Sequence, residues 1–417
     1  MSHKIESYAL ALILFVPLVL SGQQVTRRAG ISDQKLRNLD RVLQQHINQK
    51  DFGGFVTLIA RNDEVVKKKA YGFCDVEKGV PMDTTAIVPI ASMTKIITTL
   101  AVLMLYEEGW FKLNDPIEKF VPEFKEVRVF ESMDGGKIRT VAPLRKLTIR
   151  HLLSHTSGIP YGSGSTVIDS LYRRAGFQSW NRPLKEFVTV LAKIPLLNQP
   201  GQRWEYGYSH DVLGYLVEVI SEKPLNEFCK ERIFDPLGMS NTDFMVSKKR
   251  FNRLPQLYQY DSELKAESAS TQNAYAALLN GVSGGGGWFT SLGGVCTTVD
   301  DFYRIAKLLL HYGTVNGKRL VSRKSIELMV SNQVERAENM KGTEGYGLGI
   351  GVRVDAKNYG EISSSGEVYW AGGPYNSFFW VDFKENMIGI LFTNTGPFAH
   401  QNIMNRFKIL AVQAIDD

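Results

Sequence analysis

Ser92 and Lys95 have residue types and a spacing that suit nucleophilic catalysis. Residues 96–105, which follow them, are apolar nearly all the way round, a pattern typical of a helix buried on most sides. Ser92 is therefore expected at the N-terminal end of this helix, where free backbone N–H groups and the helix dipole stabilise negative charge. Lys95 lies one turn later on the same face. When buried, such a lysine can lose its charge and accept the hydroxyl proton, so the pair can activate a serine without a histidine.

The Ser-x-x-Lys pattern begins at Ser32, Ser92 and Ser262, so the pattern alone does not select a nucleophile. Ser32 is expected to cap an amphipathic helix over residues 32–50, and Ser262 lies in a polar stretch. Only Ser92 stands between an apolar approach marked by a proline and a buried helix. The context therefore favours Ser92.

Strand patterns occur towards both ends of the chain, with helical patterns between them. These patterns predict an α+β fold in which one antiparallel sheet, built from both chain ends and flanked by helices, carries an inserted mainly helical domain. Ser92 would lie at their junction, where pockets commonly form. An irregular region is expected after Pro116, and mostly helices over 179–229. The other expected elements are a hairpin of 55–60 and 65–71 about Asn62-Asp63, strands at 346–354, 368–372, 377–382 and 387–394, and helices at 32–50, 147–154, 298–310 and 401–414.

The predicted division of the 417-residue chain is a signal peptide over residues 1–22, an α/β domain over 32–125 and 285–417, and the inserted domain over 126–284. The signal peptide is indicated by Lys4 before an apolar stretch over 8–20, which is too short for a comfortable membrane span. The protein is therefore expected to be exported, periplasmic or secreted, with no stable membrane span after cleavage. An uncleaved N-terminal anchor is the alternative.

The composition is that of a globular protein, with 44% hydrophobic and 22% charged residues, and the net charge of +6 is spread along the chain. The densest basic runs, 67–69 and 248–250, are expected to be solvated strand or loop, so no nucleic-acid partner is predicted. Cys74, Cys229 and Cys296 are far apart and indicate no disulfide framework or metal pair. We expect them to be small buried side chains.

Three other patterns imitate catalytic or metal motifs, and the context argues against each. Ser283 lies in a Gly-x-Ser-x-Gly sequence, but glycines follow it where a nucleophile elbow needs a helix. His151 and His155 have the spacing of a zinc-binding helix without its glutamate, so a structural role is expected. His210 stands between a serine and an aspartate, but triad partners usually come from separate segments.

Four motifs in a fixed order are more specific than any one of them. Over about residues 35–415 the chain closely resembles the class C beta-lactamase-like serine hydrolases. That family includes penicillin-binding carboxypeptidases and the family VIII carboxylesterases and acyltransferases. The motifs are Ser92-Met93-Thr94-Lys95, Leu152-Leu153-Ser154-His155-Thr156-Ser157-Gly158, Pro200-Gly201 with Tyr206 shortly after it, and Tyr369-Trp370-Ala371-Gly372-Gly373.

The resemblance implies that Ser92 is the nucleophile, that Lys95 accepts its proton and that Tyr206 is the catalytic tyrosine. The alternative for Tyr206 is a pocket aromatic beside Trp204. Whether Lys95 or the Tyr206 phenolate acts as the base stays open.

The last motif, Trp370-Ala371-Gly372, lies where the lactamases carry Lys-Thr-Gly and where family VIII esterases often carry Trp-x-Gly. The resemblance implies that the backbone N–H of Gly373, with that of Ser92, forms the oxyanion hole, with Trp370 and Gly372 beside the substrate. The resemblance also implies that Tyr208 lies at the substrate-binding site, where it replaces the asparagine that binds the acylamino group. The lysine that pairs with a lactam carboxylate is missing. Loss of a charged contact of this kind is worth about 1.5–3 kcal/mol, which favours esters over lactams.

The expected function is a serine hydrolase that cleaves acyl esters through a Ser92 acyl-enzyme, without a metal or organic cofactor. The expected partner is a small-molecule ester or peptide-like substrate. The alternatives are a beta-lactamase or D-alanyl-D-alanine carboxypeptidase, an acyltransferase, and a non-catalytic penicillin- or peptide-binding protein. The sequence predicts neither the physiological substrate nor the oligomeric state.

Overall fold

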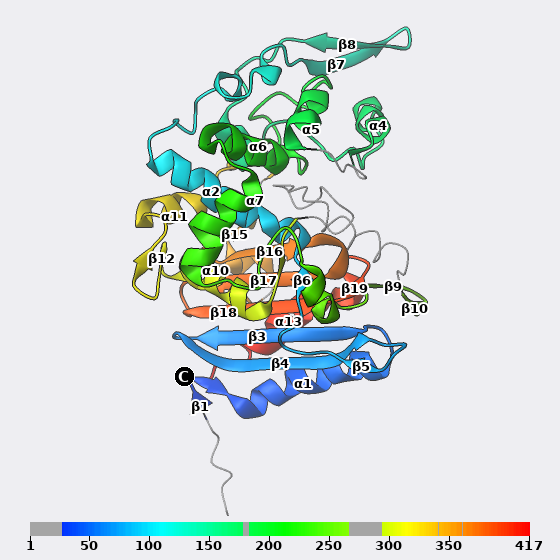
Figure 1. The fold of residues 1–417 in the computed structure, drawn as a ribbon, viewed down its shortest axis with the longest axis vertical. Coiled ribbons are helices and arrows are strands. Elements are labelled where there is room, and N and C mark those ends of the chain that lie inside the picture. Colours follow the sequence, from blue (N-terminus) through cyan, green and yellow to red (C-terminus); the bar gives the residue numbers. More distant parts are fainter. Residues whose placement is uncertain (1–26, 178–182, 267–293, 341, 361) are drawn as a thin grey trace, which may run out of the picture.

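Eight strands of the computed structural model form one antiparallel sheet that joins segments from both ends of the chain (Figure 1). The structure describes residues 27–177, 183–266, 294–340, 342–360 and 362–417. The expected signal peptide and the glycine-rich motif of Ser283 lie outside these ranges. In sheet order the strands are β14 (Glu344–Tyr346), β15 (Gly351–Arg353), β16 (Val368–Gly372), β17 (Ser377–Asp382), β18 (Met387–Thr393), β3 (Gly54–Arg61), β4 (Glu64–Asp75) and β5 (Val80–Pro81).

The hairpin of β3 and β4 turns at Asn62-Asp63, as predicted. Both residues have positive φ, 50° and 65°, which suits the tight two-residue turn that these residue types favour. Every residue of β3, β17 and β18 is buried, because helices cover both faces of the sheet.

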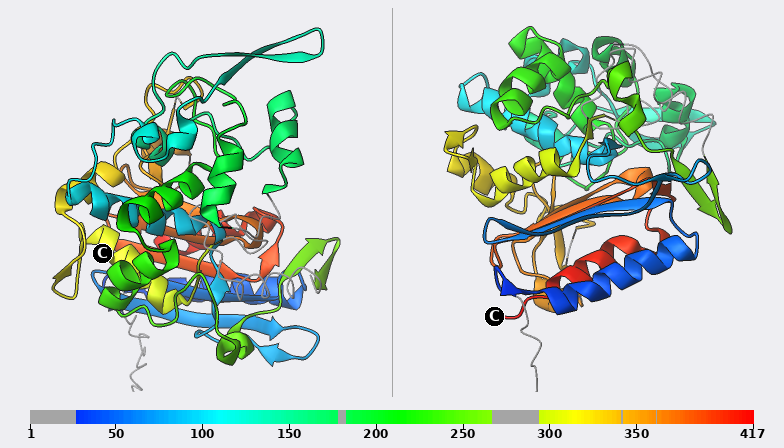
Figure 2. Two further views of the ribbon diagram at one scale, coloured as in Figure 1. Left: turned by 45° about the horizontal axis from the view of Figure 1, so that its top comes forward. Right: turned by 60° about the horizontal axis from the view of Figure 1, so that its bottom comes forward.

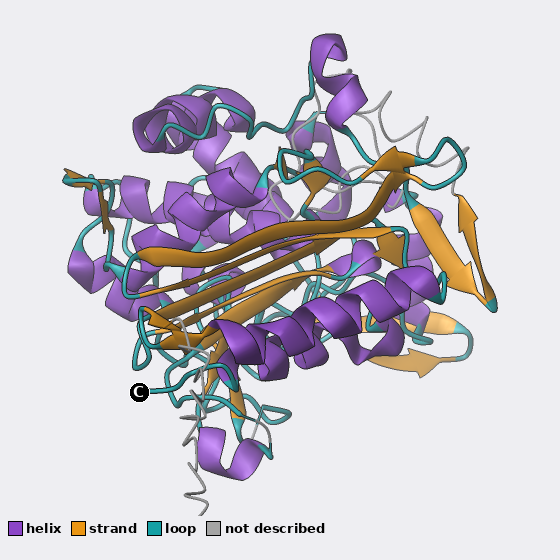
Figure 3. Ribbon diagram, turned by 90° about the horizontal axis from the view of Figure 1, so that it is seen from below, coloured by secondary structure: helices purple, strands orange, loops and turns teal. Residues whose placement is uncertain are grey.

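Two terminal helices, α1 (Asp33–Asn48) and α13 (Ile403–Val412), lie side by side on one face of the sheet (Figures 2 and 3). Their apolar side chains share a core with Trp380 of β17. Ser32 caps α1, since its Oγ accepts a hydrogen bond from the Lys35 N–H at 3.3 Å, as predicted. The opposite face packs against α10 (Val299–Leu310), and its core continues into α2 (Thr94–Glu107).

The helix α2 is enclosed by the sheet core and by a block of helices, and residues Thr94 to Leu105 are all buried. This confirms the helix without a polar face that the sequence predicted. In Figure 1 much of the helical block lies above α2, which packs directly against α6 and α7. The block consists of α3 (Ile149–Leu153), α4 (Val167–Arg174), α5 (Leu184–Leu191), α6 (Ser209–Ser221), α7 (Leu225–Cys229) and α8 (Asp235–Leu237).

Two local expectations are wrong. The region after Pro116 is not irregular throughout, because it contains a hairpin of β7 (Val129–Asp134) and β8 (Lys137–Val141) that turns at two glycines with positive φ. The single strand expected over 346–354 is two strands, β14 and β15. Between them Gly347 packs closely on the Met329 carbonyl, since a Cβ would lie 2.1 Å from its oxygen.

The α+β class and the antiparallel sheet built from both chain ends are confirmed. The three cysteines are buried free thiols, also as predicted. The domain boundaries stay a prediction. Within the described ranges no helix is long and apolar enough to cross a bilayer. The remaining elements are short: β1 (Arg27–Arg28), β2 (Ile31–Ser32), β6 (Val88–Pro89), β9 (Tyr258–Asp261), β10 (Glu263–Ala266), β11 (Cys296–Thr297), β12 (Thr314–Val315), β13 (Lys318–Arg319), β19 (Thr395–Gly396), α11 (Arg323–Met329) and α12 (Ala356–Tyr359).

Candidate active site

Ser92 lies in a single 3-10 turn, η1 (Ala91–Met93), that leads directly into α2. Lys95 is fully buried one turn later and donates hydrogen bonds to Ser92 Oγ at 3.2 Å and to the Tyr161 hydroxyl at 2.9 Å. Ala91, just before the serine, has a φ of +43°, a costly conformation for a residue with a Cβ. Such strain occurs where the surrounding fold imposes it, often at functional sites.

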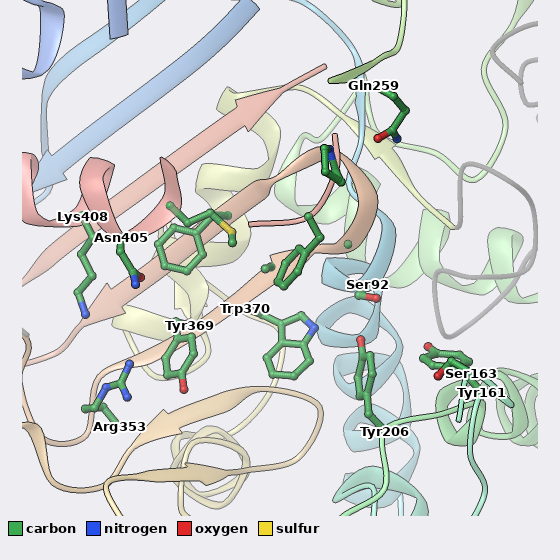
Figure 4. Close-up of a pocket in the computed structure, with 16 residues that line it drawn as sticks. Ser92, Tyr161, Ser163, Tyr206, Gln259, Arg353, Tyr369, Trp370, Asn405 and Lys408 are labelled. Carbon is green, nitrogen blue, oxygen red and sulfur yellow. The ribbon is translucent and has the colours of Figure 1, made fainter. Parts of the chain in front are cut away.

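Tyr206 reaches the same point from the loop between α5 and α6. Lys95 Nζ lies 4.7 Å from the centre of its ring, and the hydroxyl points towards Ser92 in Figure 4. Among the described residues this buried hydroxyl has no hydrogen-bond partner. A buried hydroxyl without a partner can form a hydrogen bond with a group that enters the cavity. The structure therefore brings the three predicted catalytic side chains together.

Tyr161 is a site residue that the sequence interpretation missed. Its ring meets that of Tyr206 edge to face, with the ring centres 5.2 Å apart, and both side chains line the same cavity as Ser92. Burial first, then the neighbouring Tyr206 and Asp211, raise the pKa of Tyr161 well above its ordinary value. It is therefore a neutral phenol beside the amine. The only sequence signal was its position three residues after the Leu152–Gly158 motif.

The end of β16 comes directly against the turn that carries Ser92. A Cβ on Gly372 would lie 2.5 Å from the Ile90 carbonyl oxygen, so only glycine allows this approach. Gly373, with a φ of +36°, lines the cavity next to Ser92. Trp370 also lines it, with its ring centre 5.4 Å from that of Tyr206. The structure therefore places all three predicted residues of this motif at the site.

Tyr208 does not reach the cavity, in contrast to the prediction that it contacts substrate. It is 1% exposed at the N-terminus of α6 and packs against Tyr161 with ring centres 4.6 Å apart. Its ring packs among those of Tyr172, Phe177 and Phe187. Tyr208 thus forms the wall behind Tyr161.

The cavity in front of Ser92 has a volume of about 730 Å³ and is lined mainly by apolar side chains (Figure 4). Its far end is polar, with Arg353, Asn405 and Lys408. Lys408 is paired with the buried Glu367 behind it, and Arg353 with Glu344. The apolar part is lined by Tyr369, Trp370, Ala371, Phe378, Pro397, Phe398 and Met404.

Two histidines that were expected to be structural or unrelated to catalysis lie stacked near Lys95. The rings of His155 and His210 have centres 4.8 Å apart and an angle of 29° between their planes. His210 also contacts Thr99 of α2, with 3.2 Å between Nε2 and Oγ1. Burial first, then His155 and Lys95, lower the pKa of His210 well below its ordinary value of 6.5. Both rings are therefore neutral at pH 7.

The buried neutral His210 predicts a loss of stability in acid. Below pH 6.5 the unfolded chain binds a proton at His210 that the folded chain excludes. The contribution of His210 to the free energy of unfolding is therefore complete above pH 6.5 and is lost as the pH falls. Between pH 7 and pH 5 we expect the free energy of unfolding of the His210→Asn variant to fall by about 2 kcal/mol less than that of the wild type. Urea unfolding at both pH values measures the difference. Equal losses in the two proteins would contradict the assignment.

Comparisons with known proteins show the family and the fold. The family model described as Beta-lactamase matches residues 39–414. Protein Rv1367c of Mycobacterium tuberculosis (strain ATCC 25618 / H37Rv) is 32% identical over 311 residues, which cover 72% of this chain and 75% of that protein. Esterase EstB of Burkholderia gladioli is 36% identical over 214 residues, about half of each chain (50% and 52%). The solved structure of EstCE1, a hydrolase with promiscuous acyltransferase activity, superposes with a TM-score of 0.74 at 23% identity, covering 92% of this chain and 99% of that one.

Proposed function

Because the chain belongs to the beta-lactamase family of serine hydrolases, we propose that it cleaves apolar acyl esters through a covalent intermediate on Ser92. The observation that carries this proposal is the hydroxyl of Ser92, 3.2 Å from the buried amine of Lys95, at one end of a large apolar cavity. A serine placed in this way is activated without a histidine.

In the proposed acylation, Lys95 or Tyr206 takes the proton of Ser92 as Oγ attacks the ester carbonyl. The backbone N–H groups of Ser92 and Gly373 stabilise the oxyanion. The proton then passes through Tyr206 to the leaving alcohol as the bond between the carbonyl carbon and the alcohol oxygen breaks. In deacylation, water attacks the acyl-enzyme, its proton is taken by the same base, and that proton returns to Ser92 Oγ as the acid leaves. Tyr161 holds the Lys95 amine through their 2.9 Å hydrogen bond.

The lining of the cavity supports esters over lactams. Trp370 stands where a lactamase has a lysine, and Tyr208 is turned away, so neither residue offers the polar contacts of lactam recognition. Phe378 and Met404 extend the apolar surface beyond Trp370. Apolar surface of this kind stabilises a hydrocarbon arm on the substrate rather than a charged one.

A substrate panel tests the proposed function. We expect kcat/KM for p-nitrophenyl esters to rise from acetate to octanoate by up to roughly fourfold per added CH₂, and a chromogenic cephalosporin to react at least about a hundredfold more slowly than the best ester. Faster turnover of the cephalosporin or of a D-Ala-D-Ala peptide than of every ester would contradict the proposal.

Truncation of Met404 is expected to shorten the preferred acyl chain. In Met404→Ala we expect kcat/KM for the octanoate ester to fall about tenfold, because apolar contacts with the end of the chain are lost. The acetate ester, which does not reach this side chain, should change less than about twofold. The matched control is Met133→Ala, a half-exposed methionine on β7 outside the cavity. Equal losses for both esters would show that Met404 does not contact the chain.

Acyl transfer to an alcohol is a second candidate, favoured by the same apolar lining, which can hold an apolar acceptor. Hydrolysis and transfer are separated by adding 1-hexanol to the p-nitrophenyl butyrate reaction and measuring hexyl butyrate. If the transfer product exceeds butyric acid at millimolar hexanol, acyl transfer is the main activity.

A further inference from the structure

His155 is a fully buried residue in a strained position between the two loops that carry Tyr161 and Tyr206. It follows α3 with a φ of +53°, in the left-handed region that few residues with a side chain adopt. Its ring centre is 4.8 Å from that of Tyr206 and 5.5 Å from that of Tyr346. This conformation turns the imidazole towards the proposed catalytic tyrosine instead of away from it.

The residues on both sides of Tyr206 are hydrogen-bonded to His155. The backbone N–H of Glu205 donates to the His155 carbonyl at 2.7 Å, and that of Gly207 donates to Nδ1 at 3.4 Å. Gly207 has no room for a side chain, because a Cβ would lie 2.0 Å from the Ile159 carbonyl oxygen. The short segment 205–207 is therefore fixed at both ends against residues 155–160.

Further hydrogen bonds join the same two segments. The N–H of Gly201 donates to the Thr156 carbonyl at 2.7 Å, and that of Leu197 to the Gly158 carbonyl at 2.8 Å. The hydroxyls of Ser157 and Ser209 lie 2.8 Å apart. The backbone contacts hold the loops together whatever the side chain at 155 is, whereas the Nδ1 contact depends on an acceptor at that position.

Nδ1 of His155 can accept a hydrogen bond only when the imidazole ring is neutral. Burial first, then the charge of Lys95, lower the pKa of His155 well below its ordinary value. With Nδ1 accepting from Gly207, the ring proton is on Nε2, which has no hydrogen-bond partner among the described residues. The orientation of the ring is therefore set by the Nδ1 contact and by packing.

We infer that His155 is a positioning residue that holds the Tyr206 hydroxyl at Ser92, acting through Nδ1 and the ring contact. The inference rests on the proposed function, in which Tyr206 exchanges a proton with the nucleophile and the leaving alcohol. A misplacement of about 1 Å at such a group is enough to cost about a hundredfold in rate.

The test compares three substitutions by their effect on p-nitrophenyl butyrate hydrolysis. His155→Phe keeps a ring but removes the acceptor, and we expect kcat to fall about a hundredfold with KM within about threefold. His155→Asn keeps an acceptor at the δ position and tolerates positive φ, so kcat should recover to within about tenfold of the wild type. The matched control is His151→Asn, since His151 on α3 also accepts a backbone N–H at Nδ1, from Thr148 at 3.2 Å, without touching the Tyr206 segment. The kcat of His151→Asn should stay within about twofold of the wild-type value.

A double-substitution cycle with Tyr206→Phe separates positioning from general loss of structure. If His155 acts through Tyr206, His155→Phe should have no further effect on kcat in the Tyr206→Phe background. Additive losses, or a wild-type rate for His155→Phe alone, would overturn the inference. A wild-type rate for Tyr206→Phe alone would instead contradict the proposed role of Tyr206. Thermal unfolding of each variant measures the fraction that is folded at the assay temperature. A wild-type kcat for the folded fraction of His155→Phe would overturn the inference.

Discussion

Replacing Ser92 by alanine is expected to lower kcat/KM for p-nitrophenyl esters by about 10⁴-fold or more, because the substitution removes the hydroxyl that forms the acyl-enzyme in the proposed mechanism. The fold should be retained. Within the described part of the chain the side chain of Ser92 makes one long hydrogen bond, to Lys95 at 3.2 Å, and Lys95 keeps its bond to Tyr161. Rates with p-nitrophenyl butyrate and labelling by a fluorophosphonate probe measure the effect.

The same cavity offers a control for this substitution. Ser163 also lines it, and Ser163→Ala should retain activity within about threefold and full labelling by the probe. Activity of Ser92→Ala above about a tenth of the wild type, or labelling of a different serine, would contradict the assignment of the nucleophile. Failure of the wild type to be labelled at all would favour a non-catalytic binding protein.

Replacing Lys95 by methionine is expected to lower kcat by about 10³-fold, with little loss of stability. Methionine has a similar length and no charge, so it removes the proton acceptor without leaving a large hole. The side chain of Lys95 is 0% exposed, and burial of an amine costs free energy that methionine avoids. Loss of the hydrogen bond to the Tyr161 hydroxyl lowers the free energy of unfolding by about 1–3 kcal/mol and so offsets this gain. Activity and stability should therefore separate in this variant.

A second Ser-x-x-Lys pair supplies the control. Lys35 is three residues after Ser32, and its amine binds Asp416 at 3.0 Å at the edge of the molecule. Lys35→Met should leave kcat and KM within about twofold of the wild type. The assignment of Lys95 is wrong if its methionine variant keeps kcat within about tenfold, or if both methionine variants lose activity in proportion to a fall in Tm.

The sequence by itself determined the relations that are local in the chain. Ser92 and Lys95 are three residues apart on one helix, and the absence of a polar face on that helix already implied burial. The turn at Asn62-Asp63 likewise follows from residue types that accept positive φ. In each case the geometry is fixed by backbone periodicity over a few residues, which a sequence pattern reports directly.

The tertiary structure alone decided which side chains of distant loops face Ser92. Tyr206 points into the cavity and Tyr208 away from it, although they are two residues apart, because Gly207 is pressed against residues 159–160 and Tyr208 is the N-cap residue of α6. Tyr161 and His155 join the site through hydrogen bonds to groups 66 and 52 residues away. Side-chain direction in an irregular loop depends on backbone angles that packing against remote segments imposes, and no local pattern carries that information.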